Sequence, residues 1–375
     1  MIQILVLFSL ISIMVSITDD LHSKNDNRAL DNEIFSSNFD NHDIMPRLGF
    51  GTAGIQGNTK SLVCNALSYG YKLIDTAQAI EWYSEEDLGY ALEECYSNKK
   101  NMNNINNDLM IVTKIHPRTY KFDEMMISLQ RSKLNIYRSY YKSHESMKLD
   151  VVLLHSPSCW EGHCNQEQQS ITWQEAWNNL IIAYQRNLVK FIGVSNFDIN
   201  LLKQAVEITE NKNKNKDKDD HHTTGKVSLS VIQNWMDPFH QDRKVRDYCI
   251  LNNITYMAYS TLGTQWQWKL KYNPVFESNI LKEIANDHNK NNHGNHKITK
   301  ISVSDVVLAW ALQVGVVVIP RSSKAYHIKS NAKFIQNHYD YDNSNSSSSG
   351  SSSLILSDEE MTRIRDLDGS LGQLW

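Results

Sequence analysis

The amino-acid sequence predicts a single (β/α)₈ barrel of the TIM type, and three observations carry that prediction. Eight short apolar runs occur along the chain, longer amphipathic runs lie between them, and 375 residues are enough for one large barrel with insertions. Seven runs are continuously apolar, as parallel strands buried on both faces should be. These are residues 71–75, 109–114, 149–155, 189–195, 229–234, 254–260 and 315–322, and residues 47–54 supply the eighth.

Six longer runs are expected to be helices, because their apolar residues recur three and four positions apart. They are residues 85–96, 122–134, 172–186, 200–209, 242–252 and 302–313. A doubly wound open sheet is the alternative, and such a sheet usually carries a glycine-rich phosphate loop after its first strand. Residues 47–54 contain Gly-Phe-Gly but lack the third glycine at the required offset. The strand count therefore favours the barrel.

Some segments lack the pattern of alternating strands and helices, and they divide the chain into an N-terminal region, a spacer and the barrel. Residues 1–18 are almost wholly apolar or hydroxylic and a polar stretch follows, which is typical of a secretory signal peptide, with an uncleaved signal anchor as the alternative. Residues 19–42 are expected to form a polar spacer and residues 43–375 the barrel. Three polar tracts of low complexity are expected to be disordered surface insertions, near residues 210–226, 286–297 and 342–353.

Charge and cysteine content exclude some functions. The formal net charge of −4 creates no broad positive field, so we expect no nucleic-acid partner. Five cysteines are an odd and sparse set, so free thiols are the expected state, although an oxidising compartment could join Cys159 to Cys164. No second cysteine pair has metal-ligand spacing, so we expect no metal site.

Each expected strand ends in a polar or reactive side chain. A lone buried Asp or His is more often a satisfied core group than a catalyst, but in a barrel all these ends meet at one pocket. An ammonium lowers the pKa of a neighbouring phenol, a carboxylate can hold that ammonium, and a His can donate to the same substrate oxygen. Without a nucleophile–base pair or paired carboxylates, hydride transfer from a cofactor fits better than hydrolysis. The side chains are Asp75, Lys114, His155, Ser195, Asn196, Gln233, Asn234, Tyr259, Ser260, Arg321 and Ser322.

Nine segments also match a known family, in the family's order. They are LGFGTAG, GYKLIDTA, SEEDLGYALEE, IVTKIHP, LDVVLLHSP, LVKFIGVSNF, VIQNW, YMAYSTLG and VVVIPRSSKAYHIKSN. From about Ile44 to Trp375 the chain therefore resembles the aldo-keto reductases, which are NAD(P)H-dependent carbonyl reductases on a (β/α)₈ barrel. The segments IGVSNF and IPRSS, the latter followed by Asn331, are the most specific.

The resemblance implies a catalytic tetrad of Asp, Tyr, Lys and His. By motif the first, third and fourth are Asp75, Lys114 and His155, but the family's Tyr normally stands five residues after the Asp, where this chain has Ile80. The only Tyr in the turn is Tyr83, and the turn is about two residues longer than usual. We expect Tyr83 to be the acid, with the extra residues bulging outward. The alternative is an aromatic side chain that merely covers the rim.

The resemblance also implies a cofactor site. Ser195, Asn196 and Gln233 would hold the nicotinamide carboxamide, and Tyr259 would stack on the nicotinamide ring. Ser260 and Leu262 would line the pyrophosphate, Arg321, Ser322 and Asn331 would reach the adenosine end, and Thr52 completes the set. NADPH is expected because an Arg can bind a phosphate through two hydrogen bonds, although His327 stands where the family usually has an Arg, so NADH stays open.

Function and location follow from the same resemblance. We expect a monomeric chain that reduces a small-molecule aldehyde or ketone, with substrate contacts from Trp82, Trp160 and Trp375. The alternative is a non-catalytic NADP(H)-binding regulatory barrel that acts through a protein partner. The N-terminal segment indicates the ER lumen or a membrane tether, and the cytoplasm if it is not a signal. Asn253 and Asn345 begin glycosylation sequons, whose occupancy would mark lumenal passage.

Overall fold

The computed structural model describes six stretches of the chain, all within a compact unit that spans Met45–Trp375. The described residues are 45–95, 109–141, 147–214, 226–291, 300–336 and 354–372. The predicted signal segment, the spacer, the tract at residues 342–353 and Trp375 lie outside them. Within the described stretches, no helix has the length and apolar character needed to span a membrane.

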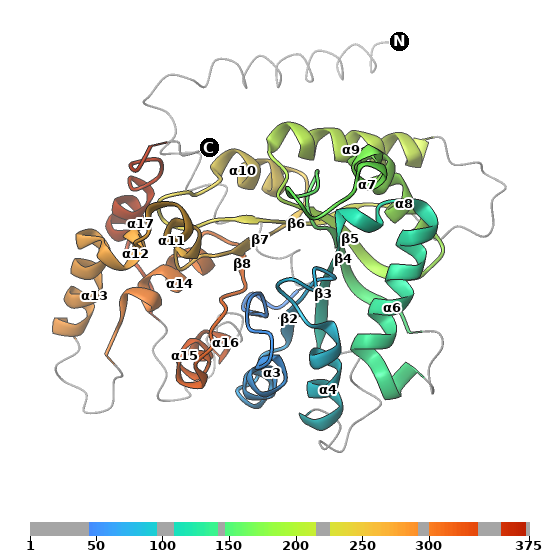
Figure 1. The fold of residues 1–375 in the computed structure, drawn as a ribbon. Coiled ribbons are helices and arrows are strands. Elements are labelled where there is room, and N and C mark those ends of the chain that lie inside the picture. The colour runs from blue at the N-terminus through green and yellow to red at the C-terminus, as the bar shows by residue number, and fades with distance from the viewer. Residues whose placement is uncertain are drawn as a thin grey trace, which may run out of the picture. The chain divides into compact units, whose positions relative to one another are not determined.

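Eight parallel strands form one sheet in which each strand pairs with the next along the chain (Figure 1). A parallel bridge between Leu48 and Val318 joins the start of this series to its end, and the Gly49 N–H donates to the Val318 carbonyl at 2.8 Å. The predicted (β/α)₈ barrel is confirmed. The strands are β1 (Phe50–Gly51), β2 (Leu73–Asp75), β3 (Met110–Ile115), β4 (Leu149–Leu154), β5 (Val189–Ser195), β6 (Leu229–Trp235), β7 (Thr255–Tyr259) and β8 (Val317–Val318).

The first and last strands are much shorter than the runs that predicted them. Only two residues in each run, at 47–54 and 315–322, belong to a paired strand. Gly54 and Gly315 adopt positive φ angles of 65° and 85°, which strands do not use. Pro320 also has no N–H to donate to a neighbouring strand. The apolar pattern therefore located these two strands but overstated their length.

Helices pack around the sheet (Figure 1), and all six that were predicted are present. They are α4 (Glu85–Cys95), α6 (Phe122–Tyr141), α8 (Trp173–Gln185), α9 (Ile199–Lys214), α10 (Arg243–Leu251) and α14 (Val303–Gln313). Further helices lie in the described stretches, and most are too short to show a repeating apolar pattern. They are α3 (Thr59–Ser68), α7 (Gln166–Ser170), α11 (Thr264–Leu270), α12 (Pro274–Glu277), α13 (Asn279–Asn291), α15 (Ala325–Asn331), α16 (Lys333–Gln336), α17 (Asp358–Arg365) and the 3₁₀ turn η3 (Pro117–Thr119).

Two of the tracts that were predicted to be disordered begin as helix, because α9 and α13 extend into them. The cause is a pair of amide side chains. Asn213 exchanges two hydrogen bonds with the backbone of Val227, at 2.8 and 2.9 Å. Asn289 does the same with the backbone of Ile301, at 2.9 and 2.8 Å. Each amide side chain pairs with a backbone N–H and C=O as a neighbouring strand would. It therefore fixes the end of its helix to the first residues after the tract.

Apolar side chains are buried on both faces of the sheet. Residues such as Ile74, Ile111 and Val152 point outward into the larger core beneath the helices. Their neighbours along the strands point inward, and this burial on both faces explains why the strands read as continuous apolar runs. The inner cluster consists of Met45, Leu73, Val112, Val151, Leu153, Val231, Met257, Val317 and Ile319.

Two disulfides are present, so the prediction of free thiols is wrong for four of the five cysteines. Cys64 of α3 pairs with Cys95 at the end of α4, with Cα atoms 5.5 Å apart. Cys159 pairs with Cys164, with Cα atoms 6.1 Å apart, and Cys249 is free and buried. The first pair is separated by 31 residues in sequence and meets only because α3 packs against α4, a contact that the sequence pattern did not reveal.

Candidate active site

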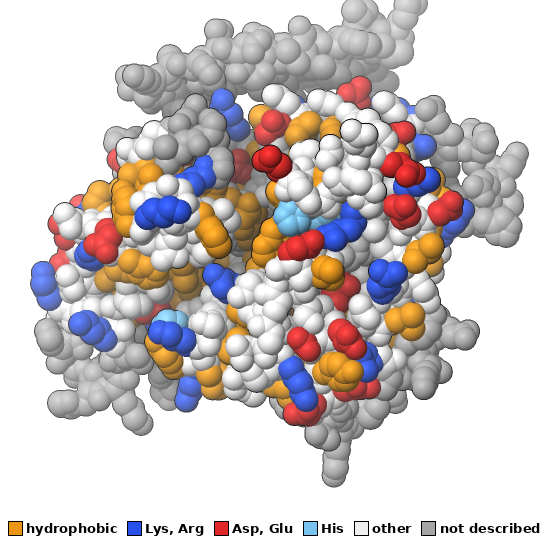
Figure 2. Space-filling model, viewed as in Figure 1, with side chains coloured by type: hydrophobic (Ala, Val, Ile, Leu, Met, Phe, Trp, Pro, Cys, Tyr) orange, Lys and Arg blue, Asp and Glu red, His pale blue; other side chains and the backbone are white. Residues whose placement is uncertain are grey.

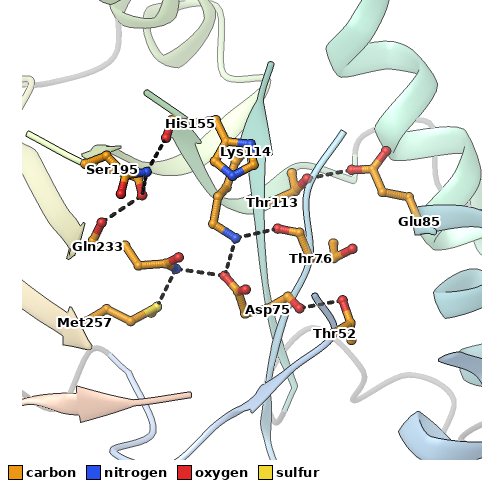
Figure 3. A network of polar contacts seen from close by, with 11 residues as sticks. Thr52, Asp75, Thr76, Glu85, Thr113, Lys114, His155, Ser195, Gln233 and Met257 are labelled. Atoms are coloured by element: carbon orange, nitrogen blue, oxygen red, sulfur yellow. Dashed lines mark hydrogen bonds and ion pairs between the residues drawn. The ribbon is translucent and has the colours of Figure 1, made fainter. Parts of the chain in front are cut away.

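A buried ion pair lies at the carboxyl ends of β2 and β3 (Figure 3). Lys114 Nζ is 2.7 Å from Asp75 Oδ1 and also donates to the Thr76 carbonyl at 2.8 Å. Gln233 Nε2 donates to the same Asp75 oxygen at 2.8 Å. Burial lowers the pKa of Lys114, whereas the Asp75 charge opposes that shift. The lysine is thus held by Asp75 and Thr76, and Gln233 of β6 in turn holds the Asp75 carboxylate.

The lengthened turn after β2 brings Tyr83 toward this pair. The N–H groups of Trp82 and Tyr83 both donate to the Ala79 carbonyl, at 3.0 and 2.9 Å, which closes a tight turn. Ile80, at the tip of that turn, is 76% exposed. The extra residues therefore bulge outward, as expected. The Tyr83 ring centre lies 5.0 Å from Lys114 Nζ, so this side chain points into the strand-end pocket.

The Tyr83 hydroxyl is an open donor. It has no hydrogen bond within the described part of the chain, and its ring lies beside Lys114 and His155. Burial of the ring raises the pKa of Tyr83 well above 10, the Asp75 charge adds to that rise, and Arg321 opposes it. At neutral pH the phenol therefore keeps its proton.

His155 follows β4 and faces Tyr83. The two ring centres are 5.9 Å apart in an edge-to-face arrangement. Burial lowers the pKa of His155 well below 6.5, and the neighbouring Lys114 and His116 lower it further, so the imidazole is neutral. Its Nδ1 is buried without a partner, whereas its Nε2 is not among such atoms, which leaves Nε2 as the nitrogen open to the pocket.

The residues expected to hold a nicotinamide carboxamide do lie together. Ser195 Oγ donates to the Gln233 carbonyl at 2.7 Å, and Asn196 Nδ2 donates to the His155 carbonyl at 2.8 Å. The Tyr259 hydroxyl donates to Asn196 Oδ1 at 2.7 Å. Gln233 Oε1 has no hydrogen bond in the described part of the chain and is not a buried unpartnered atom. This mixture of amide and hydroxyl groups fits a carboxamide, which both donates and accepts.

Two of the other predicted cofactor residues lie close to the tetrad. Thr52 Oγ1 donates to the Asp75 carbonyl at 2.8 Å (Figure 3). Arg321 Nη1 is 3.5 Å from the Gly54 carbonyl, and its charge acts on the pKa of Tyr83. Arg321 therefore lies near enough to the pocket for its guanidinium to meet an anionic group bound there.

The remaining four predicted cofactor residues lie farther along the chain, after β7 and β8. Ser260 has a φ of 54° and Leu262 is half-buried in the same turn. The Ser322 hydroxyl is 3.3 Å from His327 Nδ1, and Asn331 is buried at the end of α15. Within the described residues, no hydrogen bond joins these four side chains to the tetrad, so their cofactor role stays a prediction.

Aromatic rings form a wall beside His155. Trp160, in the loop after β4, has its ring centre 4.8 Å from that of His155, 5.4 Å from that of Trp82 and 5.3 Å from that of His116. Trp82 also lies 5.2 Å from His163. His116 and His163 were not predicted from the sequence, although His116 stands only two residues after Lys114 at the same strand end. Figure 2 shows a hollow near the centre of the face drawn there, bordered by hydrophobic side chains.

Comparison with known proteins identifies the family. A model of the Aldo/keto reductase family matches residues 47–346. The chain belongs to the aldo/keto reductase family. As a member it is an NAD(P)H-dependent carbonyl reductase, which confirms the enzyme class expected from the motifs. The non-catalytic alternative is not favoured by these matches.

Relatives of this aldo/keto reductase cover most of its length. Methylglyoxal reductase DkgB from Yersinia pestis is 28% identical over 288 residues, which are 76% of this chain and 86% of the relative. Glycerol 2-dehydrogenase (NADP(+)) from Hypocrea jecorina is 26% identical, over 76% of this chain and 83% of the relative. The solved aldose reductase from Giardia lamblia shares the fold with a TM-score of 0.63 and 21% identity, over 88% of this chain and 94% of that one.

Proposed function

We propose that this reductase converts an aldehyde or ketone to an alcohol with NADPH, and that Tyr83 protonates the carbonyl oxygen. The observation that carries the proposal is the open Tyr83 hydroxyl, in a ring that lies beside both Lys114 and His155. A bound nicotinamide cofactor supplies the hydride to the carbonyl carbon. The raised pKa of Tyr83 keeps the proton available until a substrate oxygen begins to gain charge.

The neighbours of Tyr83 assist the proton transfer in different ways. The Lys114 ammonium favours the phenolate as the proton leaves, and Asp75 keeps that ammonium in place. The neutral His155 ring has Nε2 free to donate a hydrogen bond to the carbonyl oxygen. The rings of Trp82 and Trp160 would cover the substrate and limit the access of water.

NADPH is the proposed cofactor and a small carbonyl compound the proposed substrate class. The Arg321 guanidinium supports NADPH because it can form two hydrogen bonds to a phosphate. The names of two relatives agree with this proposal, since one is a glycerol 2-dehydrogenase (NADP(+)) and the other a methylglyoxal reductase. Fluorescence quenching with NADPH and NADH measures the preference directly, and tighter binding of NADH would overturn it.

The Tyr83→Phe variant tests the catalytic proposal. Loss of the hydroxyl should lower the rate of methylglyoxal reduction by at least about 100-fold while NADPH binding stays unchanged, because the ring remains and only the proton donor is lost. Oxidation of NADPH followed at 340 nm gives the rate, and fluorescence quenching gives the binding. Tyr90→Phe on α4 is the matched control, since within the described residues the Tyr90 hydroxyl donates to the exposed Glu86. Full activity in Tyr83→Phe would exclude Tyr83 as the acid.

We also propose that the chain matures in the secretory pathway, in the ER lumen or on its membrane. Support comes from the two disulfides, which persist in oxidising compartments, and from the apolar first eighteen residues. Asn253 is exposed and begins a glycosylation sequon. Expression in cultured eukaryotic cells tests the proposal: a mobility shift on deglycosylation that disappears in Asn253→Gln supports it, and free thiols at Cys64 and Cys95 in freshly alkylated cells would contradict it.

A further inference from the structure

The loop that carries Trp160 is closed by a disulfide at the edge of the proposed active site. Cys159 and Cys164 stand at the two ends of a ring of residues that includes Trp160 and His163. Both cysteines are half-buried, so a small thiol in solution can reach them. The Trp160 ring packs against His155, and the disulfide is therefore coupled to the wall of the catalytic pocket.

His116, which lies beneath this loop, has a fixed tautomer. Its Nδ1 accepts hydrogen bonds from the Arg118 backbone N–H at 3.1 Å and from Arg118 Nε at 3.0 Å. Burial, together with the Arg118 charge, lowers the pKa of His116 to about 4, so the ring is neutral near pH 7. A neutral imidazole that accepts at Nδ1 carries its proton on Nε2. That Nε2 is buried and has no hydrogen-bond partner.

The unpartnered Nε2–H has candidate acceptors in the two sulfur atoms. One ring nitrogen of His116 and the Sγ atoms of Cys159 and Cys164 all lie within 4.8 Å of one another. A disulfide sulfur is a weak acceptor, whereas a thiolate is a strong one. Reduction of the disulfide would thus supply the partner that Nε2–H lacks.

The same three groups have the spacing of a metal site, but the hydrogen bonds favour a donor role. A metal on Nε2 requires the ring proton to move to Nδ1, where it would face two N–H donors of Arg118. Histidines that bind metal instead donate from the second nitrogen to an acceptor. The arrangement around His116 is the reverse of that pattern.

We propose that Cys159–Cys164 is a redox-active disulfide that exchanges with small thiols, and that His116 stabilises the thiolate formed. A thiolate attacks one sulfur, the Cys159–Cys164 bond breaks, and the second cysteine leaves as a thiolate that accepts from Nε2–H. A second thiol then attacks the mixed disulfide and releases the first cysteine. Two external thiols are oxidised to one disulfide, and the protein disulfide is reduced to two thiols. Opening the ring releases Trp160 from its position beside His155.

The second disulfide of the molecule is a built-in control. Cys64 and Cys95 are also half-buried, but they join two helices and close a loop of 31 residues rather than five. Cys95 is the last residue of α4 and follows Glu93 and Glu94. The negative end of the helix disfavours a thiolate there, and the two carboxylates are already paired with Arg138 and Lys60.

The test is a thiol–disulfide titration of the full-length chain. The protein is equilibrated in glutathione buffers of graded ratio with EDTA present, the free thiols are alkylated, and both cysteine pairs are quantified by peptide mass spectrometry. Cys159–Cys164 should be half-reduced in a less reducing buffer than Cys64–Cys95 requires. Equal or reversed midpoints would overturn the proposal. Because no turnover is measured, this outcome is independent of the proposed reductase function.

Variants of His116 separate a donor role from a packing role. His116→Phe removes the donor and should shift the Cys159–Cys164 midpoint toward the disulfide by about tenfold, whereas His116→Gln, which keeps an N–H donor, should restore part of the shift. His163→Phe is the matched control inside the same loop and should leave the midpoint unchanged. An equal shift in His163→Phe, or one zinc ion per chain retained by the reduced protein without EDTA, would overturn the donor role of His116.

Discussion

Two Asp–Lys pairs lie at opposite ends of the same barrel. Asp75 and Lys114 meet at the carboxyl ends of β2 and β3 at 2.7 Å, and Asp150 and Lys190 meet at the amino ends of β4 and β5 at 2.6 Å. The Lys114 side chain is 1% exposed and that of Lys190 is 31% exposed. The chemistry of the two pairs is the same, but their surroundings differ.

The surroundings indicate a role in activity for the first pair and a role in stability for the second. The Asp75 carboxylate contacts Lys114 and Gln233, which both lie on strands, and the Tyr83 ring lies beside the lysine. Asp150 instead accepts from the Ile111 N–H and from the Tyr137 hydroxyl of α6, each at 3.0 Å, so it ties two strands to a helix. In a barrel the carboxyl ends open on the active site and the amino ends contribute stability. Position, rather than residue type, therefore sets the role of an ion pair.

The same substitution at the two lysines should separate their roles by the largest effect on activity. Lys114→Met should lower kcat/KM for methylglyoxal by at least about 100-fold, because it removes the charge that favours the Tyr83 phenolate. Lys190→Met should leave kcat/KM within about twofold, because Lys190 lies at the far end of its strand. Steady-state rates with saturating NADPH measure both. A comparable loss in Lys190→Met would show that the two ends are not functionally distinct.

Asp150→Ala should lower stability rather than activity. It leaves the Tyr137 hydroxyl and the Ile111 N–H buried without an acceptor, so the free energy of unfolding should fall by about 2–4 kcal/mol. Denaturant titration followed by circular dichroism gives this value. Glu207→Ala, at an exposed position in the middle of α9, is a control for general effects of losing a carboxylate. If Asp150→Ala left stability unchanged, the structural role of this pair would be wrong.

The change of kcat/KM with pH should be the smallest of these effects, and it tests the protonation states around the Asp75–Lys114 pair. A raised pKa keeps Tyr83 protonated to higher pH, and a lowered pKa keeps His155 neutral to lower pH. Between these limits kcat/KM should change by less than about threefold from pH 6 to pH 8. The lowered pKa of Lys114 should set the alkaline decline, since the charge of that lysine is lost first. A steep rise or fall through pH 7 would contradict these protonation states.

Much of the fold was predictable from local pattern. The strands β2 to β7 and the six predicted helices appear where the apolar periodicity indicated, because each element satisfies its own hydrogen bonds and buries its own apolar residues. The positions of Asp75, Lys114 and His155 were also predictable, because the carboxyl ends of all strands in such a barrel face the same pocket. Helices of four to seven residues, such as α12 and α15, were not, because they are too short to show a period.

The sequence by itself therefore determined the barrel and the placement of Asp75, Lys114 and His155 at the carboxyl ends of its strands. Only the tertiary structure decided where Tyr83 points, because that depends on how the residues around Ile80 close against Ala79 rather than on any periodic pattern. It also decided which cysteines pair and that His116 lies beneath the Cys159–Cys164 loop. These are contacts between segments distant in sequence or irregular in backbone, and their geometry exists only once the strands have been brought into register.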